Sequence, residues 1–544
     1  MEDAAIQQGF ENLKDGAAYD NLFAASECRA KADWLIGMNG TRAFTKKYGR
    51  KQTIGRVQTP TLAMLAERQA KIQNFVKEPY YKVELSGAGV VAVSEQMTQE
   101  QDADTVQAAC DGQCAVVGSI ERKRIEKKPP KLYDLTTLQR EANRYYGLPA
   151  SQTLQALQEL YEEKLVTYPR TDSQFVTEDM RKTVESLVLA LDGTAAGVSC
   201  VINNSRVTDH HAILPTMQGV NCNRERLSET NRKVFSLVIW KLVQAVQSPF
   251  IYEDVLVTVC CQGQNFTAKY KDILQPGYTA KSVPFVEPEK DKDVPLPKKM
   301  EQGMVLPVVR AEKKQGFTSP PKVYTEDTLL SAMETAGNDQ FDDDTEKKGL
   351  GTPATRAGII EKLVKSGFAE RKGKSLIPTK DGCNLVCVLP EQITSPAMTA
   401  EWENTLMEIE RGKADADAFL SGIVRMTGDL VKAYPFLSDA EAQRFGTGKE
   451  EIGKCPRCGS PVYVGKGNFY CSNKACSFCL WEDNKFFSSK KKKLTKRIAK
   501  ELLDKGWCRV TGLYTPKKPQ LYDAVIRLDD SGGKYVSFKM EFDR

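Results

Sequence analysis

One short segment, VTYPRTDS at 166–173, carries residue types that could perform nucleophilic chemistry on a phosphodiester. Tyr168 offers a phenolic hydroxyl, Pro169 restricts the backbone beside it, and Arg170 places a permanent positive charge two residues away. A tyrosine oxygen that attacks phosphorus requires donors for the non-bridging oxygens, and a planar guanidinium supplies them. The same residues also fit a half-buried tyrosine at a strand end before a proline turn, so this segment alone leaves both interpretations open.

A cysteine cluster near the C-terminus has the spacing of a metal site. Cys455 and Cys458 form a CxxC pair, and Cys471 and Cys476 follow it as CxxxxC. Two such pairs on tight turns give tetrahedral Zn²⁺ four thiolates, so the sequence predicts a closed, structural zinc site with no chemistry of its own. Cys479 competes for the fourth position, because CSFC is itself a CxxC pair.

The two histidines of the chain, His210 and His211, are adjacent in DHHAILPT. Adjacent histidines are more often structural than catalytic, but an imidazole changes its charge near neutral pH and can orient or assist at a phosphate. Because no histidine precedes Tyr168, the sequence offers that tyrosine no obvious general base.

Composition and charge limit the class of protein. A chain of 544 residues can hold several domains with buried cores. No apolar run approaches the length of about 20 residues that crosses a membrane, and the first residues do not resemble a signal peptide, so we expect a soluble, intracellular protein. The odd total of 15 cysteines favours reduced thiols and a metal site over a disulfide framework.

Positive charge gathers at the C-terminal end. The segment 449–544 has 21 Lys and Arg against 11 Asp and Glu, a net charge of +10, and the remaining residues have a net charge of −4. A basic tail on a mildly acidic body suggests a polyanion-binding end. A solvated lysine face is the ordinary explanation for a run such as 490–493.

Helix-like and strand-like patterns alternate in blocks. Apolar residues recur at helical spacing in the first 75 residues, whereas 76–130 and 255–315 contain short apolar runs bounded by glycine, which is typical of strands. Between these blocks, two helices and strand-like LVTYPR predict a helix-turn-helix or winged-helix unit with Tyr168 at its edge. The acidic residues Asp102, Asp104 and 342–344 are expected in turns.

The clearest helix start in the chain is GLGTPATRAGII. Thr352 is expected as the N-cap, Pro353 as the first helical residue, and Gly367 as the end of the helix. The first turn presents backbone N–H groups and hydroxyls with Arg356 beside them, which are groups that bind phosphate. Helix capping alone explains Thr352 and Pro353 but gives no reason for Arg356.

A segment downstream resembles a nucleotide-binding motif, but its spacing does not match one. The segment 367–375 ends in GKS, but five residues separate its glycines where a phosphate-binding loop has four. The sequence FAERKGKSLIPT instead predicts a hairpin with its turn near Gly373. We therefore expect no ATP site.

Four motifs together resemble a type IA DNA topoisomerase, most closely the bacterial topoisomerase III branch. They are GRVQTPTL at 55–62, VTYPRTDS at 166–173, DHHAILPT at 209–216 and GTPATRAGII at 351–360. The resemblance runs along the whole chain. It implies an ATP-independent enzyme that cuts one DNA strand, forms a 5′-phosphotyrosine link, and reseals the strand to relax or decatenate DNA.

The resemblance also implies a multidomain fold, mainly α with a β-rich arch (α+β), in which a toroidal core precedes a C-terminal zinc ribbon. The implied parts are a helical strand-binding region at 1–75, a first arch segment at 76–130, a winged-helix-like tyrosine module at 131–254, a second arch segment at 255–315, a second helical region at 316–440 that packs with 1–75, a zinc ribbon at 449–485, and a C-terminal repeat at 488–544.

The resemblance assigns roles to individual residues. Tyr168 is the nucleophile, Arg170 clamps the phosphate, and His210, in preference to His211, assists. It favours Cys476 over Cys479 in the zinc ribbon. The residues implied in binding the DNA strand are Arg29 and Asp33 in CRAKADWLIG, Arg56, Gln58, Thr352 and Arg356. In the same helix, Trp34 and Lys31 are suited to stacking on bases and to phosphate contact.

The resemblance leaves one piece of the family unmatched. Family members begin with a Toprim domain whose carboxylates bind Mg²⁺, and this sequence starts after the point where that domain would end. We therefore expect the chain alone to bind single-stranded DNA in the bacterial cytoplasm, at nucleoid or mobile-element DNA. We also expect it to relax supercoils poorly, with a Toprim-bearing fragment in trans as a candidate partner.

Two other functions fit some of these residues. A non-catalytic single-stranded-DNA-binding protein could use the same folds and zinc ribbon, and it would form no covalent adduct with DNA. A tyrosine recombinase also uses Tyr, Arg and His, but it requires an arginine shortly after a histidine. HHAILP contains no such arginine, and a recombinase gives no reason for the zinc ribbon.

Overall fold

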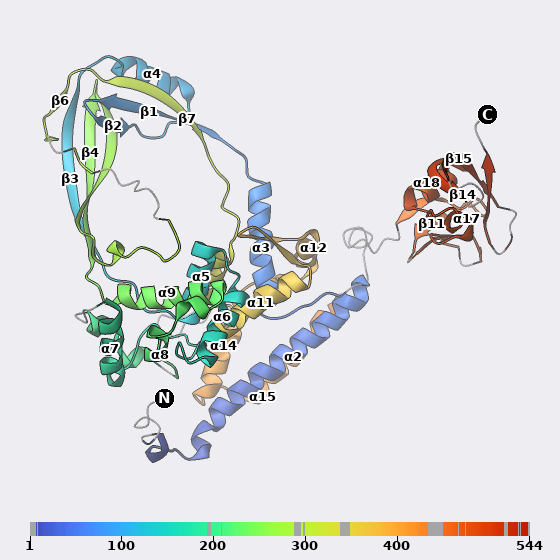
Figure 1. Ribbon diagram of the computed structural model, residues 1–544, viewed down its shortest axis with the longest axis horizontal. Helices are drawn as coiled ribbons and strands as arrows, with labels where there is room; N and C mark the ends of the chain where they lie inside the picture. The colour runs from blue at the N-terminus through green and yellow to red at the C-terminus, as the bar shows by residue number, and fades with distance from the viewer. Residues whose placement is uncertain are drawn as a thin grey trace. The chain divides into compact units, whose positions relative to one another are not determined.

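The computed structural model describes residues 7, 9–49, 51–192, 197–207, 209–287, 295–297, 300–337, 349–433, 450–465, 467–473, 475–515, 520–530, 533 and 535–541. The chain is a mixed α/β protein with two compact units (Figure 1). The first unit comprises Met1–Ala43 and Gln52–Lys432, and the second comprises Phe44–Lys51 and Ala433–Arg544. The predicted acidic turn at 342–344 lies outside the described residues. None of the described helices is long and apolar enough to cross a membrane.

A seven-stranded antiparallel sheet in the first unit combines strands from both strand-like blocks. Its order is β6-β3-β4-β5-β2-β1-β7. The long β3–β4 pairing runs from Val116 opposite Cys260 to Lys127 opposite Phe250, which joins the two blocks. The strands are β1 (Pro79–Gly87), β2 (Val90–Val93), β3 (Ala115–Lys127), β4 (Phe250–Cys261), β5 (Gln264–Gln275), β6 (Val305–Leu306) and β7 (Arg310–Phe317).

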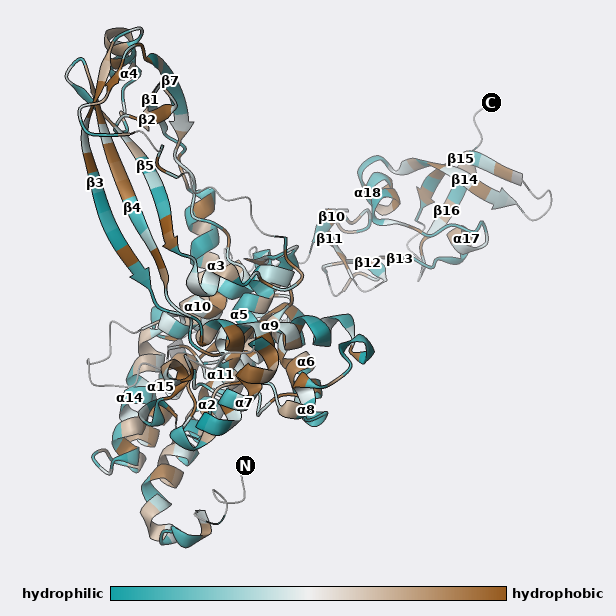
Figure 2. Cartoon of the chain, turned by 60° about the vertical axis from the view of Figure 1, so that its left-hand side comes forward, coloured by the Kyte–Doolittle hydropathy of each residue, from teal (hydrophilic) through white to brown (hydrophobic). Residues whose placement is uncertain are grey.

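One face of this sheet is buried, and a helix covers part of it. Every second side chain of β4 is buried over much of its length, and apolar and polar bands alternate along β3 and β4 in Figure 2. Helix α4 (Glu100–Cys110) buries Ala103, Val106 and Cys110 in the same core. The expectation that 76–130 is all strand and turn is therefore wrong here, because these residues recur at helical spacing.

Asp102 and Asp104 lie in α4, and the expectation that they sit in turns is wrong. The Asp104 carboxylate pairs with the Lys313 ammonium at 2.5 Å, on the neighbouring strand β7. Asp102 lies in the first turn of α4, where an acidic residue interacts favourably with the N-terminal end of the helix dipole. The helix position of Asp102 and the ion pair of Asp104 therefore give both residues a structural role.

The tyrosine module is built from helices. Asp134 caps α5, Gly147 ends that helix at φ 71°, and the two helices that follow the sequence pattern are present. The helices are α5 (Leu135–Tyr146), α6 (Ala150–Glu162), α7 (Arg181–Asp192), α8 (Met217–Val220) and α9 (Glu229–Ala245).

The segment LVTYPR is not a strand, so the expectation of a strand there is wrong. It makes one isolated bridge, Val166 with Pro215, and Pro169 has no N–H for a ladder.

A second group of helices belongs to the first unit, except that the last residues of α2 and of α15 fall in the second unit. They are α2 (Asp20–Tyr48), α3 (Gln58–Gln73), α10 (Glu326–Thr335), α11 (Pro353–Lys365), α12 (Lys380–Val388), α13 (Glu391–Thr394), α14 (Ala397–Glu410) and α15 (Ala416–Ala433). The predicted cap at Thr352, the first helical residue Pro353 and the hairpin β8 (Ala369–Lys372) with β9 (Ser375–Pro378) are confirmed. Ala32 and Ile36 of α2 share a small core with Met398 and Trp402 of α14.

The second unit contains two small sheets that share one core. The sheet β10-β11-β12-β13 and the sheet β14-β15-β16 both bury side chains in it, together with Phe487 of α17 and Leu502 of α18. Their bounds are β10 (Glu451–Lys454), β11 (Pro461–Val464), β12 (Asn468–Cys471), β13 (Cys479–Trp481), α17 (Lys485–Ser488), α18 (Lys496–Lys505), β14 (Trp507–Thr515), β15 (Gln520–Asp529) and β16 (Ser537–Glu541).

Candidate active site and metal site

The tyrosine segment lies beside the histidine segment, held there by hydrogen bonds. The Thr167 N–H donates to the Leu214 carbonyl at 2.9 Å, and the Leu214 N–H donates to the Thr167 hydroxyl at 2.9 Å. Further along, the Thr171 hydroxyl donates to the His210 carbonyl at 3.0 Å. These bonds bring Tyr168 and His210 together although they are distant in the sequence.

The rings of Tyr168 and His210 pack against one another. Their centroids lie 4.3 Å apart and their planes are inclined by 34°. Tyr168 is half-buried and His210 is exposed, so the phenol remains partly accessible beside the imidazole. His211 instead places Nδ1 2.7 Å from the Ala212 carbonyl oxygen, and burial lowers the pKa of its imidazole. The structure thus sets His210, and not His211, against the predicted nucleophile.

Arg170 is exposed, two residues beyond Tyr168. It makes no ion pair or hydrogen bond with any residue that the structure describes, whereas the preceding Pro169 is buried. An unpaired guanidinium keeps its five N–H donors available, and phosphate oxygens are acceptors that match its planar fork. The predicted clamp is therefore free to bind an anion.

A cavity of about 650 Å³ lies where the tyrosine segment meets the start of α11. Asp172 and Ser173 line it from the tyrosine segment, and Thr352 and Arg356 line it from the α11 motif. Two motifs that are far apart in the sequence thus form one cavity. The other lining residues are Lys131, Asp134, Gln174, Phe175, Asn203, Ser205, Arg206, Glu334 and Pro353.

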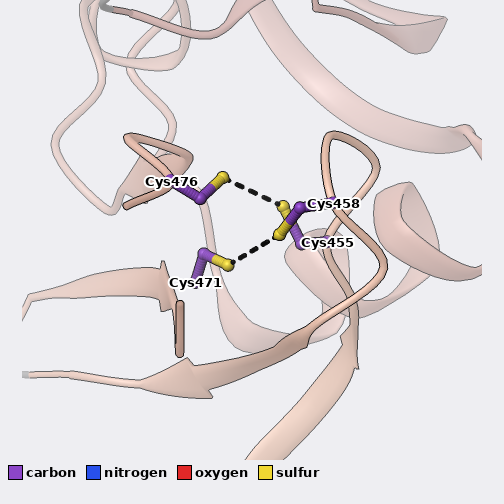
Figure 3. Close-up of side chains that lie close together, drawn as sticks. All are labelled: Cys455, Cys458, Cys471 and Cys476. Atoms are coloured by element: carbon purple, nitrogen blue, oxygen red, sulfur yellow. Dashed lines mark hydrogen bonds between the residues drawn. The ribbon is translucent and has the colours of Figure 1, made fainter. Parts of the chain in front are cut away.

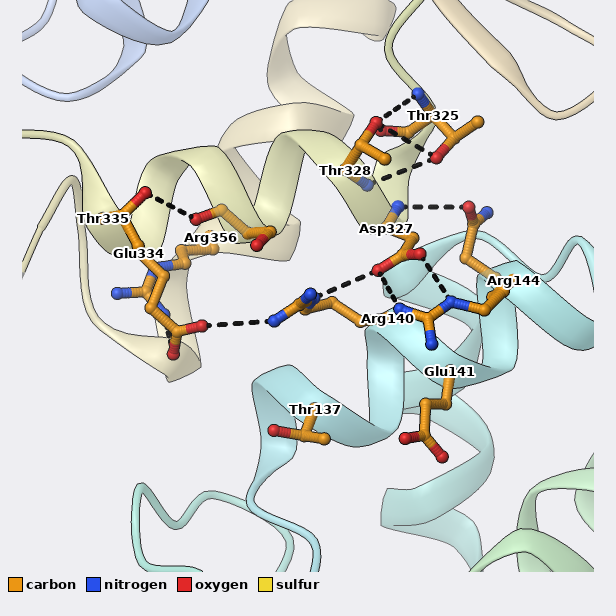
Figure 4. A network of polar contacts seen from close by, with 12 residues as sticks. Thr137, Arg140, Glu141, Arg144, Thr325, Asp327, Thr328, Glu334, Thr335 and Arg356 are labelled. Carbon is orange, nitrogen blue, oxygen red and sulfur yellow. Dashed lines mark hydrogen bonds and ion pairs between the residues drawn. The ribbon is translucent and has the colours of Figure 1, made fainter. Parts of the chain in front are cut away.

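Arg356 forms part of the cavity wall but is itself buried, with 3% of its surface exposed. It donates to the Leu350 carbonyl at 3.2 Å and to the Thr136 hydroxyl at 3.1 Å. It also lies 3.5 Å from the carboxylate of Glu334, and both residues are labelled in Figure 4. Burial lowers the pKa of this guanidinium. These partners hold the guanidinium in a fixed orientation at the cavity wall.

Asp134 is a cavity residue that the sequence interpretation missed. Its carboxylate accepts from the Thr137 N–H at 2.6 Å and from the Gln174 amide at 3.0 Å. Burial raises the pKa of Asp134 to about 6, although both hydrogen bonds act in the opposite direction. The available signal was an aspartate directly before a helical pattern, which is a preferred N-cap.

Ion pairs join α5 of the tyrosine module to α10. Arg140 and Arg144 both reach Asp327, at 3.0 Å and 2.8 Å, and Arg140 also lies 3.6 Å from Glu334 (Figure 4). Asp327 is buried, so the two guanidinium groups compensate its charge. This polar contact positions α5, and with it the start of the cavity wall at Asp134.

Three of the predicted strand-binding residues meet around Glu403 of α14. Arg56 lies 2.7 Å from Asp33 and 2.7 Å from Glu403, and Arg29 lies 2.5 Å from the other oxygen of Glu403. The side chain of Arg56 is 5% exposed, whereas those of Arg29 and Asp33 are 42% and 44% exposed. A DNA strand could therefore contact Arg29 and Asp33 directly, while Glu403 holds Arg29 and Arg56 holds Asp33. Glu403 lies in TAEWENTLMEIERGK and was missed, because nothing in the sequence shows that it faces α2.

The remaining two strand-binding candidates differ in exposure. Gln58 is buried, and its amide donates to the Thr53 hydroxyl at 2.9 Å, while its Oε1 has no partner among the described residues. Thr352 is exposed, and its hydroxyl lies 3.1 Å from that of Thr355. Thr352 is thus open to the cavity, whereas Gln58 belongs to the interior at the start of α3.

The four predicted cysteine ligands converge in the second unit (Figure 3). Their sulfur atoms all lie within 4.8 Å of one another, with 3.7 Å between Cys455 and Cys476 and 3.4 Å between Cys458 and Cys471. Zn–S bonds of about 2.3 Å in a tetrahedron separate the sulfurs by about 3.8 Å. The thiols therefore fit a zinc ion, with Cys476 and not Cys479 as the fourth member of the cluster.

Arg457, in the first cysteine loop, ties that loop to the other sheet of the unit. Its guanidinium binds both carboxylate oxygens of Asp530, each at 2.6 Å, and donates to the Gly533 carbonyl at 2.8 Å. Asp530 follows β15, so a bidentate ion pair joins the metal loop to the C-terminal sheet. The metal loop and the C-terminal sheet are therefore expected to stabilise each other.

Comparisons with known proteins decide the family. A family model described as DNA topoisomerase matches residues 17–421. DNA topoisomerase 3 from Bacillus licheniformis and that from Bacillus subtilis are each 35% identical to the chain, over 514 and 511 residues, covering 88% of this chain and 69% of each relative. The chain belongs to the type IA DNA topoisomerase family.

The fold of this topoisomerase also resembles that of a solved relative. Full-length topoisomerase I from Thermotoga maritima superposes with a TM-score of 0.63 at 21% identity, covering 88% of this chain and 79% of that chain. Family membership makes the topoisomerase an isomerase that acts on DNA. The matched family region contains Tyr168, Arg170, His210 and Arg356, and the cysteine cluster lies beyond it.

Replacing Glu403 of the topoisomerase with glutamine should lower the free energy of unfolding by about 3 kcal/mol, because Arg29 and buried Arg56 lose a shared carboxylate. Burial alone would raise the pKa of Glu403, but Arg56 and Arg29 lower it overall. Urea unfolding measures the change. The exposed Glu401→Gln on the same helix is the control, with an expected change below about 0.5 kcal/mol.

The parent protein and Glu403→Gln should differ in how their stability depends on pH. A carboxylate with a lowered pKa stabilises the fold above its unfolded-state pKa, near 4.5, and this contribution is lost as pH falls through the folded-state pKa. The parent should therefore lose more stability than Glu403→Gln below pH 4.5. Equal losses in both would contradict the ion-pair assignment.

Proposed function

We propose that this topoisomerase cuts one DNA strand through Tyr168 and holds the broken end as a 5′-phosphotyrosine. The observation that carries this proposal is the packed pair of Tyr168 and His210, with Arg170 exposed two residues further along the chain and without a partner among the described residues. The phenol oxygen attacks phosphorus, the bond from phosphorus to the 3′ oxygen breaks, and the phenolic proton leaves. The 3′ oxygen gains a proton and later attacks the phosphotyrosine to reseal the strand.

Arg170 and His210 have separate tasks in this proposal. The guanidinium of Arg170 binds the non-bridging oxygens, where negative charge grows as the phenol attacks. His210 packs on the phenol ring and can orient it, or carry a proton near the phosphate. The ester bond energy is retained in phosphotyrosine, so resealing requires no ATP.

The strand is proposed to enter through α2 and reach the cavity. Arg29 and Asp33 are half-exposed on α2, and Trp34 beside them is 62% exposed and suited to stacking on an unpaired base. Thr352 and Arg356 meet the strand at the cavity. This arrangement favours single-stranded DNA over duplex, because stacking requires a free base face.

Two metals enter the proposal in different ways. Zn²⁺ fits the four cysteines and would hold the second unit together, with no role in cleavage. The Mg²⁺ that the resemblance implies has no comparable group of ligands, since the cysteines are the only cluster of three or more metal-binding side chains among the described residues. We therefore assign Mg²⁺ no ligand and no step.

End-labelled oligonucleotides test the proposed polarity. Single-stranded DNA carrying a 3′ or a 5′ label is incubated with the full chain and Mg²⁺, with and without a purified Toprim fragment, and then denatured. A 5′-phosphotyrosine keeps the 3′ label on the protein and releases the 5′ label. Retention of the 5′ label would indicate the opposite polarity. Binding with neither label retained would favour the non-catalytic DNA-binding function.

A further inference from the structure

A second tyrosine packs against the proposed nucleophile. Tyr161, at the end of α6, has its ring centroid 5.6 Å from that of Tyr168, and the two planes meet at 84°. This perpendicular geometry is one that aromatic pairs prefer. Tyr168 therefore contacts two rings, His210 and Tyr161, which come from two different parts of the tyrosine module.

The buried face of α6 and the turn that follows it fix the backbone at Tyr161. Leu157 and Leu160 of α6 are fully buried in the core of the module, which fixes the helix. The Lys164 N–H donates to the Tyr161 carbonyl at 2.9 Å, and the Leu165 N–H donates to the Leu160 carbonyl at 2.9 Å. This tight turn, with Lys164 at φ 61°, leads the chain directly into the tyrosine segment.

The ring of Tyr161, and not its hydroxyl, makes the relevant contact. The hydroxyl has no hydrogen-bond partner among the described residues, and 38% of the residue is exposed. A partly exposed tyrosine at a helix end could be a surface residue without a role. Its contact with a half-buried tyrosine that itself packs on His210 distinguishes it from such a residue.

We propose that Tyr161 is a positioning residue for the nucleophile. Its ring limits the orientations of the Tyr168 phenol, so that the hydroxyl stays directed toward a phosphate held by Arg170. This inference rests on the proposed cleavage by Tyr168. Contacts between perpendicular rings are typically sufficient to change an equilibrium between two side-chain positions by about two- to tenfold.

Single-turnover kinetics of covalent adduct formation test the inference, with Tyr161→Leu and Tyr161→Phe in the full chain and a Toprim fragment supplied with Mg²⁺. Tyr161→Leu should lower the maximal rate about two- to tenfold and leave the DNA concentration for half-maximal rate unchanged. Tyr161→Phe keeps the ring and should restore the parental rate. Tyr19→Leu removes another exposed tyrosine, 50% exposed, and should change neither quantity.

Circular dichroism melting accompanies the kinetics, because a destabilised variant would also react slowly. If Tyr161→Leu melts early, Tyr161→Gln, which keeps a good helix former at that position, replaces it. A parental rate in a well-folded Tyr161→Leu or Tyr161→Gln overturns the inference, as does a Tyr161→Phe that is as slow as Tyr161→Leu. Absence of any adduct in the parent would instead overturn the proposed function on which the inference rests.

Discussion

Replacing Tyr168 with phenylalanine should abolish covalent attachment to DNA and leave strand binding unchanged. The substitution removes one oxygen and keeps the ring that packs on His210. Loss of the nucleophile should lower the rate of adduct formation at least about a thousandfold, since no step replaces a missing attacking atom. Denaturing gels with labelled oligonucleotide measure the adduct, and fluorescence anisotropy of the same oligonucleotide measures binding.

Tyr145→Phe provides a matched control for that experiment. Tyr145 lies on α5 of the same module, packs edge-on against Trp240, and has a pKa that burial raises. Removing its hydroxyl should leave adduct formation near the parental rate. Adduct formation by Tyr168→Phe at a comparable rate would show that another residue attacks the DNA.

The second large effect is expected on the stability of the second unit when one of the four proposed zinc ligands is removed. Replacing Cys471 with alanine leaves three thiols where tetrahedral zinc requires four. Structural zinc contributes on the order of 10 kcal/mol to the folding of small domains, which is comparable to the whole stability of such a unit. The two sheets of the second unit share one core and are joined by the Arg457–Asp530 ion pair. We therefore expect both sheets to lose their resistance to proteolysis together.

Two measurements on the full chain check this expectation. Bound zinc is quantified with a colorimetric chelator after denaturation, and limited proteolysis reports cleavage within 450–541. Cys471→Ala should bind less than one equivalent and be cut rapidly, whereas Cys479→Ala should keep one equivalent of zinc and resist cleavage. A Cys479→Ala protein without zinc would show that Cys479, not Cys476, completes the site.

Local signals predicted the elements whose ends are set by single residues. Thr352, Pro353 and Gly367 mark the start and end of α11, and the positive φ of Gly367 is a conformation that glycine adopts at low cost. Helix α4 was missed because its flanks read as strands. LVTYPR read as a strand from its residue types, but its single bridge depends on a partner segment that sequence patterns do not reveal.

In the candidate site, too, residue types could be predicted from the sequence, whereas contacts between distant segments could not. The residue types of Tyr168, Arg170 and His210 suggested the chemistry, and the resemblance supplied their grouping. The hydrogen bonds that bring 166–173 and 209–216 together are long-range contacts, and no local pattern encodes them. Glu403 was missed for the same reason, since its partners Arg29 and Arg56 lie more than three hundred residues away in the sequence.

Peptide mapping of the trapped adduct tests the central claim most directly. The full chain is incubated with single-stranded oligonucleotide, Mg²⁺ and a Toprim fragment, then denatured, treated with nuclease and protease, and examined by mass spectrometry. We expect the peptide that contains Tyr168 to carry a 5′-linked nucleotide on the phenolic oxygen. A nucleotide on any other residue, or an unmodified Tyr168 in a chain that has retained DNA, would contradict this account.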